Sequence, residues 1–317
     1  MALSRRTLLV RAVQLGIALF VIVAAFDALE GQWGEARRVA DDVRLDWGIL
    51  TAASAIVVAA YLVLVATWRA VVNGMGGRLR YADAAYIWFV SAIARYAGAL
   101  WQVFAMSALS QRLGAPPVVA AGAAVVTTIV SVLTGFGVLL ATGAAAAGDI
   151  GARGYTVLAL GILALALAPF IARPASALAA GVTGRAIELP RLTSRALAAA
   201  AIGSIVSWFA YGTAFWLLTA AVLGDAPGGW LVYVTVYTTA YLAGYLALVP
   251  AGIGVAEGAM VGAFALAGVL SPAEALTVAV VSRLWRTVME ILPGVVLLVV
   301  RGRPQATLRT NAGERDG

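Results

Sequence analysis

Three charged residues interrupt the last long apolar run of the sequence, which extends from about Ala273 to Val300. Arg283, Arg286 and Glu290 follow one another at intervals of about one helical turn, so a helix places them on one side. Charges within hydrocarbon are costly, so they face a protein interior and are paired or functional. The spacing predicts either a structural Arg286–Glu290 ion pair or a phosphate site in which Arg283 is unpaired and Glu257 lies nearby.

Another acidic residue, Glu257, follows a segment typical of a broken helix. The segment reads Pro250-Ala251-Gly252-Ile253-Gly254-Val255-Ala256-Glu257. Proline cannot continue a preceding helix, and glycine accepts backbone angles that other residues avoid. Irregular backbone at membrane depth is tolerated where protein or a watery cavity surrounds it. We therefore predict a backbone break at Pro250, Gly252 and Gly254, with Glu257 in the first turn of the next helix. Such a break beside a carboxylate is typical of transport sites.

A third group lies in the interrupted apolar region from Tyr81 to Gly114, where Arg95 and Tyr96 precede Gly98. Gly98 is a second candidate for a backbone break. Arg95 is either a side chain that reaches the cytoplasmic surface or a phosphate ligand. The candidate substrate-binding residues are Arg95, Tyr96, Glu257, Arg283, Arg286 and Glu290. Their three arginines exceed their two glutamates by one positive charge, which an anionic ligand would neutralise.

The amino-acid composition predicts that these charged groups lie in a membrane protein. The 317 residues are 62% hydrophobic and only 12% charged, which is about half the charge of a soluble domain. Several apolar runs have the length that crosses a bilayer. Cysteine and histidine are absent, and we expect no metal site and no cofactor. The net charge of +7 favours contact with anionic lipid and not with nucleic acid.

The placement of arginine predicts the topology, because basic loops remain in the cytoplasm. The N-terminus, the loops around Arg78 and Arg185, and the C-terminal tail should all be cytoplasmic. This holds if residues 81–114 enter and return while residues 253–270 cross; the reverse assignment places the Arg185 loop outside. The fold class is therefore an all-α polytopic bundle of about eight spanning helices with one or two broken or re-entrant helices. Residues 1–303 would form one transmembrane domain, and residues 304–317 a disordered cytoplasmic tail.

The sequence also predicts an internal repeat. Gly98 and Gly114 have the same separation as Gly252 and Gly268, and a proline and a long helix follow each pair. A second periodicity is a stripe of tyrosines on one helix face, which we interpret as packing or, alternatively, as the lining of a path for a sugar or head group. The stripe comprises Tyr233, Tyr237, Tyr241 and Tyr245.

The segment from Leu248 to Arg303 resembles the flippase-like transmembrane region of lysylphosphatidylglycerol synthases. The resemblance rests on Pro250 to Glu257, Ser282-Arg283, Pro293-Gly294 and the earlier pair Arg95-Tyr96. The family usually continues that pair with proline-glycine, whereas Ala97-Gly98 stands here. The resemblance implies that Arg95, Glu257 and Arg283 are functional. It also implies translocation of an anionic, aminoacylated or polyprenyl-linked lipid between leaflets.

We accordingly expect a lipid translocase of the cytoplasmic membrane and no enzyme. No segment here corresponds to the soluble domain that transfers the amino acid in full synthases, so aminoacyl transfer is not expected. The partners would be membrane lipids, with a homo-oligomer or a lipid-modifying enzyme as further possibilities. Two other functions stay open: a small-solute permease, and a glycosyltransferase that uses a lipid-linked sugar with Asp41-Asp42 in its first outer loop.

Overall fold

The computed structural model describes residues 45–97, 99–146, 192–246, 252 and 254–301, and within these ranges the chain is helical without strands. The helices are α2 (Trp47–Gly74), α3 (Tyr81–Ala94), the short 3-10 turn η1 (Arg95–Ala97), α4 (Ala99–Gln111), α5 (Pro117–Ala146), α7 (Ser194–Leu223), α8 (Trp230–Leu246), α9 (Val255–Ala267) and α10 (Pro272–Arg301). The predicted all-α bundle is thus confirmed.

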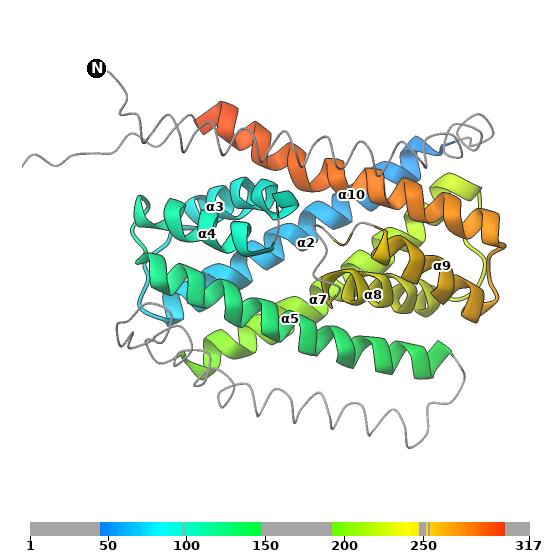
Figure 1. Cartoon of the computed structure of the whole chain (residues 1–317), viewed down its shortest axis with the longest axis horizontal. Helices are drawn as coiled ribbons and strands as arrows, with labels where there is room; N and C mark the ends of the chain where they lie inside the picture. The colour runs from blue at the N-terminus through cyan, green and yellow to red at the C-terminus, as the bar shows by residue number, and fades with distance from the viewer. Residues whose placement is uncertain (1–44, 98, 147–191, 247–251, 253, 302–317) are drawn as a thin grey trace, which may run out of the picture.

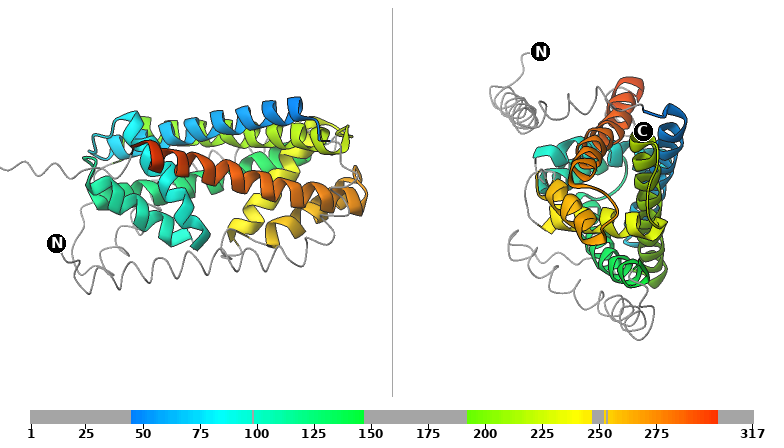
Figure 2. Two further views of the ribbon diagram at one scale, coloured as in Figure 1. Left: turned by 90° about the horizontal axis from the view of Figure 1, so that it is seen from above. Right: turned by 90° about the vertical axis from the view of Figure 1, so that its right-hand side faces the viewer.

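Four long helices form the frame of the bundle (Figure 1). Three of them, α2, α5 and α7, contain stretches that are long and apolar enough to cross a bilayer. The fourth, α10, has 30 residues but carries the charged groups noted above. α2 packs along α7 in the opposite direction, and both views in Figure 2 place these two helices side by side. These helices therefore support the prediction of a membrane bundle.

Local sequence explains where the long helices begin and end. The Asp46 carboxylate accepts hydrogen bonds from the backbone N–H groups of Gly48 and Ile49, at 2.8 and 3.0 Å, and so caps α2. Gly224 ends α7 with a φ of 81°, a left-handed conformation that glycine adopts without steric cost.

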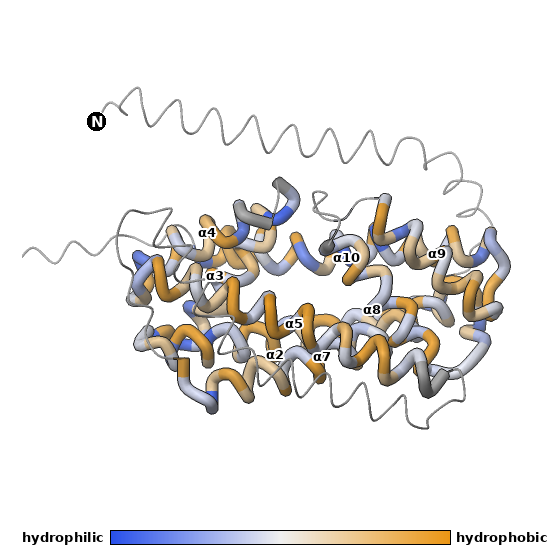
Figure 3. The backbone as a smooth tube through the Cα atoms, turned by 60° about the horizontal axis from the view of Figure 1, so that its bottom comes forward, coloured by the Kyte–Doolittle hydropathy of each residue, from blue (hydrophilic) through white to orange (hydrophobic). Residues whose placement is uncertain are grey.

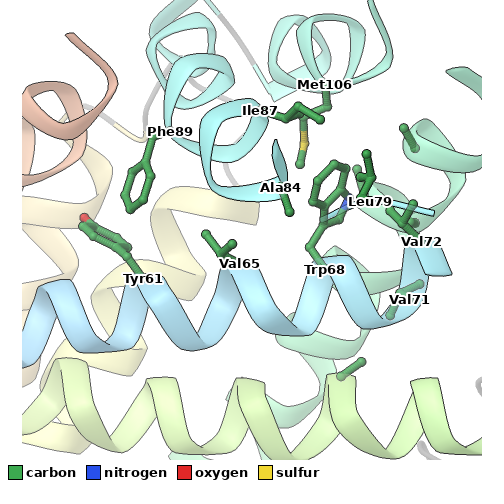
Figure 4. Close-up of a cluster of buried hydrophobic side chains, with 14 of the residues drawn as sticks. Tyr61, Val65, Trp68, Val71, Val72, Leu79, Ala84, Ile87, Phe89 and Met106 are labelled. Carbon is green, nitrogen blue, oxygen red and sulfur yellow. The ribbon is translucent and has the colours of Figure 1, made fainter. Parts of the chain in front are cut away.

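Small residues allow the helices to approach closely, as is usual in membrane bundles. A Cβ added at Gly203 of α7 would collide with Thr67 of α2. One added at Gly212 would lie 2.6 Å from Val234 of α8. Figure 4 shows the apolar core beside α2, where Trp68 packs among other buried hydrophobic side chains.

The short helices form two hairpins. We call α3, η1 and α4 hairpin A, and α8 with α9 hairpin B. The two arms pack against each other in each hairpin. Hairpin A lies between the end of α2 and the start of α5, and hairpin B between the end of α7 and the start of α10, so they enter from opposite ends of the bundle (Figure 1).

The second arm of hairpin B is short for a crossing, and our expectation that residues 253–270 cross the membrane stays a prediction. α9 contains 13 residues, which span about 20 Å, whereas the hydrocarbon core is about 30 Å thick. Glycines end this helix early: Gly254 precedes it with a φ of 82°, and Gly268 ends it with a φ of 65°. α9 packs along α8 in the opposite direction, as α4 packs along α3.

The order long, short, short, long occurs twice, once in α2 to α5 and once in α7 to α10. α4 and α9 each contain 13 residues, and α5 and α10 each contain 30. Gly114 and Gly268 both have positive φ angles shortly before the last long helix. The two series run in opposite directions, because α5 and α10 are antiparallel in Figure 1. These correspondences favour the predicted repeat.

Several predictions fall outside the described residues. They concern the break residues Gly98 and Pro250, the first outer loop with Asp41-Asp42, the loop around Arg185 and the tail at 304–317. The two predicted spans at the N-terminus and near residues 154–172 also lie outside the described ranges. The total number of crossings, the extent of the domain and the sidedness of the termini therefore stay predictions.

Candidate functional site

One helix, α10, carries three of the candidate residues, and its position is fixed by contacts with α2 and α3. The Trp285 indole N–H donates to Ser54 Oγ on α2 at 3.0 Å. Gly294 packs so closely against α3 that an added Cβ would lie 2.5 Å from the Phe89 carbonyl oxygen. Figure 3 shows hydrophilic segments in the middle of the bundle beside α4 and α10, as well as at its ends. The charged face of α10 thus lies against the interior.

Glu257 joins hairpin B to α10. One carboxylate oxygen accepts a hydrogen bond from the Gly254 backbone N–H at 2.7 Å and caps α9. The other oxygen lies 3.3 Å from Arg283 Nη1. Glu257 is only 8% exposed, so this ion pair is largely removed from solvent. The prediction that Glu257 lies near Arg283 is therefore confirmed, whereas the expectation that Arg283 is unpaired is wrong, because hairpin B brings this carboxylate close enough to form an ion pair.

A second ion pair joins hairpin A to α10. Arg95 Nη2 lies 3.3 Å from Glu290 Oε2, and the Tyr96 hydroxyl donates to the same oxygen at 2.9 Å. Glu290 therefore pairs with the turn of hairpin A and not with Arg286, contrary to the Arg286–Glu290 pair that the spacing suggested. The physical reason is that the folded hairpin delivers both Arg95 and Tyr96 to one carboxylate.

Arg286 lies between these two pairs in the sequence of α10. Among the described residues, no carboxylate lies within 4 Å of it, and its buried Nε has no hydrogen-bond partner. Its guanidinium carbon lies 5.8 Å from the centre of the Tyr237 ring. The predicted surplus of one positive charge in the candidate set is thus located on Arg286.

A cavity of about 280 Å³ lies in the bundle beside hairpin A. Arg95 and Glu290 contribute to its wall, as does Tyr237, whose ring lies next to Arg286. Neither Glu257 nor Arg283 belongs to this wall. The structure therefore divides the candidate residues into a group at the cavity and a separate pair at the start of α9.

Aromatic, uncharged polar and aliphatic side chains form the rest of the cavity wall. Its aromatic residues are Tyr61, Trp88, Trp208, Tyr211, Tyr237, Tyr241 and Tyr245. Its uncharged polar residues are Thr67, Gln102, Thr127, Thr128, Ser131, Ser204 and Ser207. Three of the four tyrosines in the sequence stripe therefore line the cavity, whereas Tyr233 is fully buried in the core. Packing, our first interpretation of the stripe, applies to Tyr233 and to Tyr237, which is buried in the same core, and the alternative stays a prediction.

Sequence reasoning overlooked the hydroxyl residues of α5 and α7. The available signal was their spacing, since Thr127 and Ser131 lie on one face of α5, and Ser204 and Ser207 on one face of α7. Serine and threonine are also common in tightly packed membrane helices, so this signal does not by itself identify a cavity.

The backbone break of hairpin B is closely packed. Gly252 is buried with a φ of 66°, and an added Cβ would lie 2.9 Å from the Gly244 Cα on α8. Only glycine satisfies both conditions without strain. Within the described ranges, His, Cys, Asp and Glu side chains nowhere gather in groups of three that could hold a metal ion.

Long apolar helices, interrupted hairpins and ion pairs inside the bundle define a polytopic membrane protein. The match to a known family agrees: the lysylphosphatidylglycerol synthase TM region corresponds to residues 12–294, so the chain belongs to this family. The resemblance inferred from the short motifs is thereby confirmed. A comparison with curated proteins finds no match.

Proposed function

We propose that this protein is a lipid translocase of the cytoplasmic membrane, which moves an anionic, aminoacylated or polyprenyl-linked lipid between leaflets without enzymatic chemistry or a cofactor. The observation that carries the proposal is Arg286, whose charge no acidic side chain among the described residues balances within 4 Å. A charge at the centre of a membrane helix costs about 3 kcal/mol on insertion scales. An anionic ligand would offset this cost.

Arg286 is suitably placed for a phosphate that enters the cavity. It is one side chain away from the cavity, because Tyr237 contacts both. Arginine grips phosphate through two parallel hydrogen bonds, which lysine cannot reproduce. Arg95 also belongs to the wall and has a buried Nε without a hydrogen-bond partner in the described structure. The phosphate would therefore lie between Arg95 and Arg286.

The two hairpins suggest how the head group would reach this position. Each is too short to cross the bilayer as two spans, so we infer that both are re-entrant and enter from opposite leaflets. Broken helices from two inverted repeats that meet near the bilayer midplane are a known plan for carriers. The head group would pass between the hairpins while the acyl chains stay in the bilayer, and both termini would be cytoplasmic.

Proteoliposomes test the translocase activity. Acyl-labelled anionic lipids are placed in one leaflet, and their appearance in the other is followed for wild type, Arg286→Met and Arg286→Lys. We expect Arg286→Met to lower the rate at least tenfold and Arg286→Lys to retain an intermediate rate. Gly262→Ala is the matched control, because nothing lies within 4 Å of the added Cβ.

Two results would overturn the proposal. If wild-type protein moves every anionic lipid tested at the protein-free rate, the protein is not a translocase of such lipids. If Arg286→Met is as fast as wild type, the unbalanced arginine is not the anion site. The permease alternative is supported by the cavity size, since about 280 Å³ is close to the lower end of the range for small-molecule pockets, roughly 300 to 1,000 Å³.

A further inference from the structure

We propose that hairpin A thins the bilayer beside it, so that the polar level of the surrounding lipids reaches the outer face of its tip. The inference concerns the bulk lipids around the protein, whatever their head groups. It goes beyond the proposed function, because it does not depend on which lipid is moved. Its basis is the exposed indole of Trp101, on the second arm of hairpin A.

The tip of hairpin A lies midway along the bundle. The cavity wall contains Tyr61 and Trp208, which lie at the middle of α2 and of α7. Arg95 and Gln102, on either side of the tip, belong to the same wall. Trp101 precedes Gln102 in the sequence, so it lies close to the same level. In a bilayer centred on the long helices, this is the level of the hydrocarbon midplane.

The outward face of α4 differs from that of a long helix at this level. Trp101 is 47% exposed and makes an edge-on ring contact with Phe104, with centroids 6.1 Å apart. Near the middle of α7, by contrast, the exposed side chains include the aliphatic Ile205 and Val206. Tryptophan is enriched at the membrane–water interfaces, where its ring is apolar and its N–H meets polar groups. Hairpin A therefore presents an interfacial side chain at the depth where α7 presents aliphatic ones.

The indole N–H of Trp101 needs a hydrogen-bond acceptor. Within the described part of the chain it has none, whereas the indole of Trp230, which is also exposed, donates to Thr213 Oγ1 at 3.0 Å. A donor left unsatisfied in hydrocarbon is costly, because no water is available there. Water or the ester oxygens of lipids would satisfy this N–H if the polar level of the bilayer reaches it.

Two further properties of hairpin A favour a thin bilayer. The Arg95 side chain at the tip is 25% exposed although it pairs with Glu290, and bilayers accommodate such charges by local thinning and by admitting water. The second property is length. α4 has 13 residues and spans about 20 Å, and a lipid-facing segment shorter than the hydrocarbon core of about 30 Å is matched by a thinner bilayer.

Spin labels along the outward face of α4 test the inference, and the chain contains no cysteine that would compete for the label. Four exposed residues share this face and follow one another from the base of the hairpin to its tip: Gln111, Ala108, Phe104 and Trp101. Each is replaced by cysteine in a separate full-length variant, labelled with a nitroxide and reconstituted in phosphatidylcholine vesicles. The ratio of collisions with a nickel chelate to collisions with oxygen reports how polar the surroundings of the label are.

The expected pattern has a minimum in the middle of the series. The ratio should fall from Gln111→Cys to Phe104→Cys and rise again at Trp101→Cys. Val206→Cys is the matched control, because Val206 is exposed near the middle of α7. The ratio at Trp101→Cys should be at least threefold higher than at this control.

Two results of the labelling would overturn the inference. If the ratio keeps falling to Trp101→Cys and equals that of Val206→Cys, the bilayer has its normal thickness there. If both reagents are excluded at Phe104→Cys and Trp101→Cys, protein covers this face, either another part of the chain or a second copy.

A second measurement keeps the indole in place, and so decides the question if Trp101→Cys fails to fold. The difference in tryptophan emission between wild type and Trp101→Phe isolates the signal of Trp101. Phosphatidylcholine with bromine near the head group should quench this signal at least twofold more than phosphatidylcholine with bromine near the chain ends. Equal quenching or the reverse order contradicts the inference. Neither experiment measures transport, so the inference and the proposed function can fail independently.

Discussion

Arg283 and Glu290 lie two turns apart on α10, and each forms an ion pair with a different hairpin. Arg283 binds Glu257 at the start of hairpin B's second arm, and Glu290 binds Arg95 at the turn of hairpin A. At 1.5 Å per residue, the two anchors are only about 10 Å apart along the helix axis. α10 therefore holds the 3-10 turn of hairpin A and the start of α9 at neighbouring levels of the bundle.

Removing one partner of the hairpin A pair should be more harmful than removing both. Glu290→Leu leaves Arg95 without its carboxylate in the described structure and the Tyr96 hydroxyl without its acceptor, so we expect a loss of about 3 kcal/mol in unfolding free energy. The double variant Arg95→Leu with Glu290→Leu should recover most of this loss. Denaturant titration in detergent micelles measures both. Equal losses in the single and double variants would contradict a coupled pair.

The two roles of Glu257 can be separated by two substitutions. Glu257→Gln removes the charge facing Arg283 but keeps an oxygen that can accept from the Gly254 N–H. Glu257→Ala removes both interactions, so it should be less stable than Glu257→Gln by about 1 kcal/mol, the usual value of a helix cap. The same titration compares them. Identical stability would mean that the cap contributes nothing.

The close packing at the hairpin B break predicts a strong effect of one methyl group. Gly252→Ala introduces a side chain at positive φ and against the Gly244 backbone, so we expect a loss of about 2 kcal/mol or more. Gly262→Ala, on the neighbouring helix α9, should change stability little because nothing lies within 4 Å. Thermal unfolding followed by tryptophan fluorescence provides the comparison. A Gly252→Ala protein as stable as the control would disprove the close approach.

The contact between α2 and α7 predicts a similar asymmetry in the frame. Gly203→Ala forces a Cβ into Thr67, and overpacking of this kind costs about 1–3 kcal/mol. Gly137→Ala on α5 meets nothing within 4 Å and is the control. The second variant Thr67→Ala should relieve the loss caused by Gly203→Ala. If it does not, the two helices do not meet at these residues.

Arg286 should behave differently from the paired charges in stability as well as in transport. Arg286→Met removes a buried charge that has no carboxylate within 4 Å among the described residues. The unfolding free energy should therefore stay equal or rise. Arg283→Met, by contrast, removes the arginine that pairs with the Glu257 carboxylate, so it should lower the unfolding free energy. Unfolding titrations of both variants test the contrast. A large loss for Arg286→Met would show that this residue is structural.

The sequence by itself determined the class of protein and predicted which charged residues lie inside the bundle. Apolar runs of bilayer length specify membrane helices. In hydrocarbon no water is available for the backbone N–H and C=O groups, so they must form hydrogen bonds within a helix. Glycine predicted the break before α9, because it permits angles that end a helix locally. Arg95, Glu257, Arg283, Arg286 and Glu290 stood out for the same reason: charges are rare inside apolar runs. All these signals act within a few residues of one another.

Only the tertiary structure decided which charges pair and where the cavity lies. The spacing within α10 suggested Arg286 as the partner of Glu290, but Glu290 binds Arg95, which is distant in the sequence. Likewise, Tyr241 of α8 and Ser204 of α7 line the same cavity. The sequence of neither helix predicts that the other helix lies beside it. Ion pairs and cavities depend on distances between helices, and those distances follow from packing at contacts such as Gly203 against Thr67. Periodicity fixes the face of a helix, whereas packing fixes what that face meets.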